Sequence, residues 1–173
     1  MTVGYTSYQA AVIGHAINML VGCAAFRTLV GAATEAAARG FIIEFDGGDP
    51  AEAGTDKAIA ANGVAFTLTP PYAQIASMDF PADDESATNW LRRNGVVQIA
   101  FVLPPTTGHT APERQRNALN LLGTICDELN AQYGQPNKLG TGAASLTLKP
   151  LPDGAGANRG TTSGIITLTW RNH

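Results

Sequence analysis

The sequence predicts an α+β fold, in which helices cover a mainly antiparallel sheet of about four to five strands. Segments with alternating apolar and polar residues outnumber segments with helical spacing. The helical segments are also not regularly interleaved with the strand segments, as a parallel α/β sheet would require. The chain has 173 residues and no break in composition. We therefore expect a single domain over residues 1–173.

An N-terminal helix is expected over Tyr8–Leu20, because apolar residues recur there at intervals of three and four. Ser7 precedes it as a plausible N-cap, and Gly22 interrupts the pattern. A second, alanine-rich helix is predicted over Phe26–Arg39, with Gly40 as its C-cap.

A long helix is predicted at about 112–133. Thr110 and Glu113 have the spacing of a capping box, and Pro112 lies in the first turn. Gly134 would be its C-cap. The apolar positions of this helix define its buried face: Ala118, Leu122, Ile125, Leu129 and Tyr133.

The longest strand signal lies at Asn89–Leu103, where both faces are largely apolar, as expected for a central strand. Gly95 is a candidate position for a β-bulge. One face is expected to pack on the long helix: Val97, Ile99, Phe101 and Leu103. The other extended segments are predicted at Phe41–Phe45, Val64–Thr69 and Tyr72–Phe80, followed by an antiparallel hairpin of two strands near Leu146–Leu148 and Ile165–Arg171.

Four long connections are predicted at about 47–63, 80–88, 134–143 and 152–163. Long loops in a compact domain usually have a function or are disordered. These loops have little net charge, whereas disorder favours high charge. We therefore expect some of them to become ordered against a neighbouring copy or a partner.

Composition excludes several classes of function. Charged residues make up only 14% of the chain and the net charge is −3. We therefore expect no basic face that would bind nucleic acid, and no sequence-specific recognition of nucleic acid. No apolar run reaches the length of a membrane span. The first residues, Met1–Gly4, lack the basic start of a signal peptide. The expectation is a protein made in the cytoplasm, without a membrane partner.

The sequence contains no recognisable set of residues for catalysis, cofactor binding or metal binding. His15, His109 and His173 are far apart in the sequence, and we expect His15 to be a core or interface residue. Cys23 and Cys126 lie in apolar helical patterns, which favours buried free thiols, although a disulfide stays open. The glycine-rich segments lack the flanking residues of a phosphate loop, and no nucleophile elbow is present. We predict neither cofactor nor metal, and no enzymatic activity.

One region resembles the tail-terminator proteins of long-tailed bacteriophages. In segment 93–104, a basic residue and Gly95 precede an apolar–Gln–apolar strand that ends at Pro104, and the amphipathic helix 114–133 follows. The strand Gly164–Arg171 and the helix Tyr8–Leu20 are also similar to segments of that family. Ala24–Arg39 and the 47–63 loop have no counterpart there.

The resemblance implies a structural protein of the virion, located in the tail or neck. It would form a hexameric ring on the tail tube, stop tube polymerisation and present a docking face to the head. Its partners would be itself, the tail tube protein, head-completion or connector proteins and possibly the sheath protein. The alternatives are another neck or tail component, such as a head-closure, connector or tail-completion protein. A small cellular binding domain, or an enzyme with an unrecognised site, is the less favoured class.

A ring that caps a tube needs a heterologous, ring-closing interface between its subunits. We expect an acidic turn of one subunit to contact arginines of the next, which would set the register. The candidate interface residues are Asp83, Asp84 and Glu85 on the acidic side, and Arg92, Arg93, Arg159 and Arg171 on the basic side.

Overall fold

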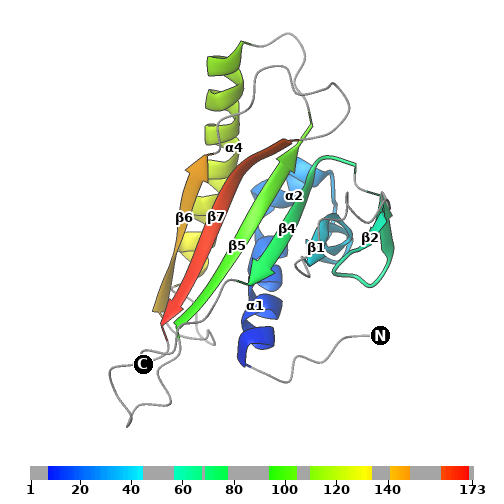
Figure 1. Ribbon diagram of the computed structural model, residues 1–173, viewed down its shortest axis with the longest axis vertical. Coiled ribbons are helices and arrows are strands. Elements are labelled where there is room, and N and C mark those ends of the chain that lie inside the picture. Colours follow the sequence, from blue (N-terminus) through cyan, green and yellow to red (C-terminus); the bar gives the residue numbers. More distant parts are fainter. Residues whose placement is uncertain are drawn as a thin grey trace.

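The computed structural model describes residues 8–44, 57–67, 69–77, 94–104, 110–133, 141–148 and 161–171. These residues form the predicted α+β fold, with a five-stranded sheet in the order β1-β4-β5-β7-β6 and helices behind one face (Figure 1). The helices are α1 (Tyr8–Gly22), α2 (Ala24–Val30), α3 (Glu35–Ala38), the 3-10 turn η1 (Arg39–Phe41) and α4 (Ala111–Gln132). The sheet contains β1 (Ile42–Glu44), β4 (Tyr72–Ser77), β5 (Asn94–Leu103), β6 (Thr141–Leu148) and β7 (Thr161–Arg171), and a separate hairpin contains β2 (Lys57–Ile59) and β3 (Ala65–Thr67).

The sheet is antiparallel except where β1 pairs in parallel with β4. Strand β5 is central, as predicted, since it pairs with β4 on one side and β7 on the other. The expected bulge at Gly95 is wrong, because Gly95 pairs in regular register with Trp170. The irregularity lies instead between Phe101 and Val102, whose partners are Gly164 and Thr162. The extra residue therefore belongs to β7, not to β5.

The core fills the space between the sheet and the helices. Strand β5 contributes Val97, Ile99 and Phe101, which are all fully buried. The Phe101 ring packs edge-on against Phe26 of α2, with ring centroids 6.3 Å apart. The same core cluster contains Leu122, Ile125 and Leu129 of α4, the helix on which this face was predicted to pack. Helices α1 and α2 lie behind β4 and β5, whereas α4 lies behind β6 and β7 (Figure 1).

The helix predicted over Phe26–Arg39 is in fact interrupted. Helix α2 ends at Val30 because Gly31 adopts a left-handed conformation with φ 68° and its N–H bonds to the Thr28 carbonyl. Helix α3 then starts afresh, with the Thr34 hydroxyl accepting a hydrogen bond from the Ala37 N–H at 3.1 Å. The high helix propensity of alanine did not override these two local signals.

Helix α4 follows the prediction closely. The capping box is present, since the Thr110 N–H donates to the Glu113 carboxylate at 2.8 Å. Ala118, Leu122, Ile125 and Leu129 are buried, as expected, and Tyr133 is half-buried. The predicted cap Gly134 lies outside the described residues.

Parts of the predicted loops are strands. Residues 57–59 within the expected 47–63 loop form β2, and β6 and β7 begin at Thr141 and Thr161, inside the expected 134–143 and 152–163 connections. Strand β2 has only three residues, and β6 and β7 begin with small or polar residues, so hydrophobic alternation did not mark these positions as strand. The expected 80–88 loop lies outside the described residues.

The β2–β3 hairpin packs on the other face of the sheet, beyond β1. Phe66 contacts a small second core of Ile43, Tyr72 and Val102. Its ring stacks edge-on with Phe41 at 5.9 Å and with Tyr72 at 5.7 Å. The hairpin also covers the outer edge of β1, where Ile43 bridges to Ala60. This aromatic cluster fixes the hairpin to the β1 end of the sheet.

Candidate interaction surface

The junction of α1 and α2 is a polar network held by α4. The Gln132 amide donates to the Met19 carbonyl at 2.9 Å and to the Cys23 sulfur at 3.3 Å. The Glu128 carboxylate accepts the Ala25 N–H at 3.1 Å, and thereby caps the start of α2. The network stabilises the sharp bend between α1 and α2, and sequence reasoning missed it because its partners are more than a hundred residues apart.

This network does not provide an activated nucleophile. Burial, and then the nearby Glu128 charge, raise the pKa of the Cys23 thiol to about 12. Burial also raises the pKa of Cys126, with the Asp127 charge acting in the same direction. A thiol with a raised pKa carries little thiolate at neutral pH and reacts slowly. Both cysteines are buried and free, so the open possibility of a disulfide is not realised here.

The described residues contain no group of three or more His, Cys, Asp or Glu side chains that could hold a metal ion. His15 is half-buried in α1. His109 and His173 lie outside the described residues. The prediction that the chain binds no metal and no cofactor stays a prediction.

No single described helix is both long and apolar enough to cross a membrane. Helices α1 and α2 together have the length and apolar composition of a membrane span, but the two are bent by 78° at the break between them.

Most of the predicted interface charges lie outside the described residues, namely Asp83, Asp84, Glu85, Arg92, Arg93 and Arg159. Arg171 ends β7, where its register partners are Asn94 of β5 and Thr141 of β6. The expected contacts between the acidic turn and the arginines therefore stay predictions.

The front face of the sheet in Figure 1 carries no described helix over β5, β7 and β6. Its side chains form cross-strand rows, such as Gln98, Thr167 and Ser145. The side chains described on this part of the face are uncharged: Val96, Gln98, Ala100, Ala143, Ser145, Thr147, Ile165, Thr167 and Thr169. Gln74, on the same face of the neighbouring strand β4, is uncharged too. An open, uncharged sheet face is suited to contact with another protein surface rather than to chemistry.

The two edges of the sheet differ. Strand β1 is covered by the hairpin, whereas no described strand pairs with the outer edge of β6. One side chain partly protects that edge: the Asn130 amide donates to the Ala144 carbonyl at 3.0 Å and accepts the Ala144 N–H at 2.8 Å. Strand β6 contains neither a charged residue nor a proline, so it lacks the usual protection of an edge strand.

The hairpin tip, defined here as Ile59–Ala65, also exposes apolar side chains. Ile59 is 64% exposed and Val64 is 60% exposed. Gly63 turns the chain with φ 80°, and the Val64 N–H donates to the Asn62 side-chain oxygen at 3.0 Å. The asparagine–glycine pair at 62–63 was an available turn signal, but exposure is a tertiary property that the sequence pattern did not reveal.

Comparisons with known proteins give no lead, since no family model, no curated protein and no solved structure matches the chain.

Proposed function

We propose that this chain is a structural subunit of a bacteriophage tail, which forms a ring at the end of the tail tube and stops its growth. The observation that carries the proposal is the placement of the segments that resemble tail-terminator proteins. The strand in segment 93–104 becomes the central strand β5, and the Gly164–Arg171 strand pairs beside it as β7. The long helix and the N-terminal helix then cover the same face of this sheet.

The surface supports an assembly role. A ring subunit needs broad faces for its neighbours, for the tube below and for the head connector above. The chain offers a sheet face on which the described side chains over β5, β7 and β6 are uncharged, and a β6 edge that no described strand covers. The described cysteines, by contrast, have raised pKa values and lie in packed surroundings, which argues against nucleophilic catalysis.

The function is tested by adding the purified chain to the tail tube protein of the particle that encodes it. We expect the chain to bind tube ends and to stop elongation at substoichiometric ratios, so that electron microscopy shows shorter tubes. A heat-unfolded sample of the chain is the control. Unchanged tube lengths, with no chain at tube ends, would contradict the proposal.

A second candidate is another protein of the neck, because related neck and tail-completion proteins would share this general α+β plan. The two candidates separate in the same assay. A head-closure or connector protein would leave tube growth unchanged and would bind the head connector instead.

A further inference from the structure

The turn of the β2–β3 hairpin contains an asparagine–glycine pair, Asn62–Gly63, and both residues are exposed. Asparagine is one of the thermally labile residues of proteins. The backbone nitrogen of the following residue attacks the side-chain amide carbon, and glycine hinders this attack least because it has no side chain. The turn therefore holds a pair of residues with intrinsic chemical reactivity.

The neighbouring backbone orients the Asn62 amide for this reaction. The Val64 N–H donates to Asn62 Oδ1 at 3.0 Å. Negative charge develops on this oxygen when the amide carbon is attacked, so the Val64 N–H stabilises the intermediate. On the other side of the amide, a Cβ on Gly40 would lie 3.1 Å from Asn62 Nδ2. Because Gly40 has no Cβ, no side chain of that residue obstructs the departing nitrogen.

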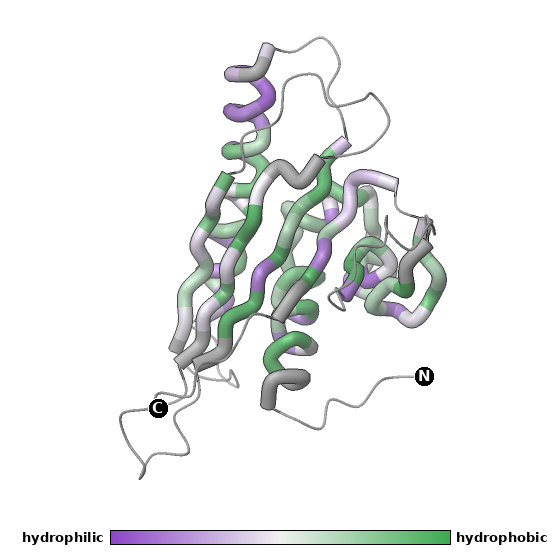
Figure 2. The backbone as a smooth tube through the Cα atoms, viewed as in Figure 1, coloured by the Kyte–Doolittle hydropathy of each residue, from purple (hydrophilic) through white to green (hydrophobic). Residues whose placement is uncertain are grey.

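One hydrogen bond must open before the reaction. The Gly63 N–H donates to the Ala60 carbonyl at 2.8 Å, so the attacking nitrogen is occupied while the turn is closed. The hairpin lies beside the β1 end of the sheet (Figure 2), and Asn62, Gly63 and Val64 are all exposed. Exposed turns open locally at a much smaller free-energy cost than global unfolding. Local opening of the turn therefore sets the rate.

The chain contains a second asparagine–glycine pair, Asn94–Gly95, which serves as an internal comparison. This pair begins β5, where Asn94 pairs with Arg171 and Gly95 pairs with Trp170 of β7. Ring closure rotates the asparagine backbone, and a paired strand opposes that rotation because its ladder hydrogen bonds would break. The fold thus restrains this pair and leaves the hairpin pair accessible.

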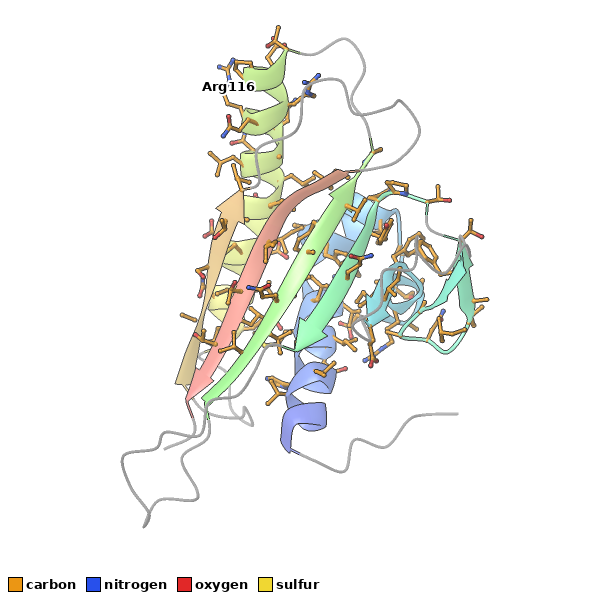
Figure 3. All side chains as sticks on the ribbon, in the orientation of Figure 1. Arg116 is labelled. Carbon is orange, nitrogen blue, oxygen red and sulfur yellow. The ribbon has the colours of Figure 1, made fainter. Side chains whose placement is uncertain are left out.

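Exposure alone does not make an asparagine reactive. Asn117 and Asn120 are also exposed. They lie on α4 in the turns around Arg116, at the end of the helix that projects past the sheet (Figure 3). The residues that follow them are alanine and leucine, whose side chains hinder the attack, and the helix holds their backbone in place. Among these four asparagines, only Asn62 combines exposure, a turn and a following glycine.

We propose that Asn62 is a site of spontaneous deamidation. Hydroxide removes the Gly63 N–H proton, and the nitrogen forms a bond to Asn62 Cγ. The Cγ–Nδ2 bond then breaks, and ammonia leaves after taking up a proton from water, which regenerates hydroxide. The product is a cyclic succinimide. Water adds to either ring carbonyl and opens the ring, giving aspartate or isoaspartate without any oxidation or reduction. This inference goes beyond the proposed function and does not depend on it.

The two products affect the hairpin differently. Aspartate keeps an acceptor for the Val64 N–H and adds a negative charge. Isoaspartate places an extra methylene group in the main chain, so the Gly63 N–H can no longer reach the Ala60 carbonyl in the same geometry. Since Ala60 bridges to Ile43, isoaspartate loosens the attachment of the hairpin to β1.

The test is incubation of the purified full chain in a mildly alkaline buffer, with peptide mass spectrometry at intervals. We expect acid at position 62 to form at least about fivefold faster than at position 94, because only the turn opens locally. Part of the product should be isoaspartate. Asn117 and Asn120 should stay intact over the same period. Amide exchange at Ala60, whose N–H donates to the Val64 carbonyl at 3.0 Å, should accelerate in the converted protein.

Two controls assign the difference to the fold. In concentrated urea, Asn62 and Asn94 should convert at similar rates, because both are followed by glycine and neither is restrained. Asn62→Gln should stay unmodified at position 62, because glutamine would have to close a larger and less favourable ring. Circular dichroism verifies that this variant is folded.

An intact Asn62 in the folded chain, at times when the urea sample has converted, would overturn the proposal. Equal conversion of Asn62 and Asn94 in the folded chain would overturn it as well, because the fold would then play no part. Neither result bears on the tail function, which the tube assay judges separately.

Discussion

Gly142 of β6 lies directly against the ring of Tyr133, the residue that follows α4. A Cβ on Gly142 would fall within the contact radii of the Thr169 carbonyl oxygen and the Tyr133 ring. Gly142→Ala is therefore expected to cost about 3 kcal/mol of unfolding free energy through overpacking. The measurement is urea denaturation of both proteins.

Gly123→Ala is the matched control. The added methyl group meets no atom within 4 Å, and alanine is favoured over glycine inside a helix by about 1 kcal/mol. This variant should be as stable as the parent or more stable. Equal destabilisation of both variants would mean that the close packing at Gly142 is absent.

The Cys23 thiol gives a prediction about pH. Its pKa is raised by burial from 9.0 to about 12 in the folded chain. Below about pH 9 both states keep the proton, so the stability is fully present there. As the pH rises toward 12, the unfolded chain loses this proton first and the folded state is progressively destabilised.

We expect the free energy of unfolding to fall between pH 8 and pH 10, with roughly 1 kcal/mol of the fall due to Cys23. Cys126 and Tyr133, whose pKa values are also raised by burial, act in the same direction. Cys23→Ala should therefore show a smaller fall, not an absent one. An identical fall in both proteins would contradict the assignment to Cys23.

At the scale of elements, β5 organises the fold. Phe101 is fully buried and packs on Phe26, so Phe101→Ala should cost about 3–5 kcal/mol through the cavity that it leaves. Gln98→Ala, on the open face of the same strand, is the control and should have little effect. A loss below about 1 kcal/mol for Phe101→Ala would show that this face is not core.

The edge strand β6 depends on Asn130. Asn130→Ala would leave the Ala144 N–H and carbonyl without their protein partner, at an expected cost of about 1–2 kcal/mol. Amide hydrogen exchange at Ala144 should accelerate in the variant, while exchange in β5 stays slow. Unchanged exchange at Ala144 would mean that the amide does not protect the edge.

The sequence predicted those elements that carry their own periodic or capping signals. The capping box of α4, its buried face and the central position of β5 are local patterns or long apolar runs. The split at Gly31 and the three-residue strand β2 were not predicted, because each depends on one glycine or on pairing with a distant strand. The parallel pairing of β1 with β4 is likewise decided by topology and leaves no mark on the residues.

At the scale of the whole molecule, the sequence predicted that the chain has an interface for assembly, but it did not predict which described residues form that interface. Low charge and long loops favour an assembly subunit, but the pattern pointed to charged residues that lie outside the described part of the chain, apart from Arg171. The exposed residues Ile59 and Leu119 were not singled out, because an apolar residue in a sequence is expected to be buried.

The central claim is that this chain forms the ring at the end of a phage tail tube. Cryo-electron microscopy of the neck of particles that encode the chain tests it most directly. The account predicts six copies of this fold in one ring, between the last ring of the tube and the head connector. Purified particles that lack the chain, or that carry it elsewhere, would contradict the account.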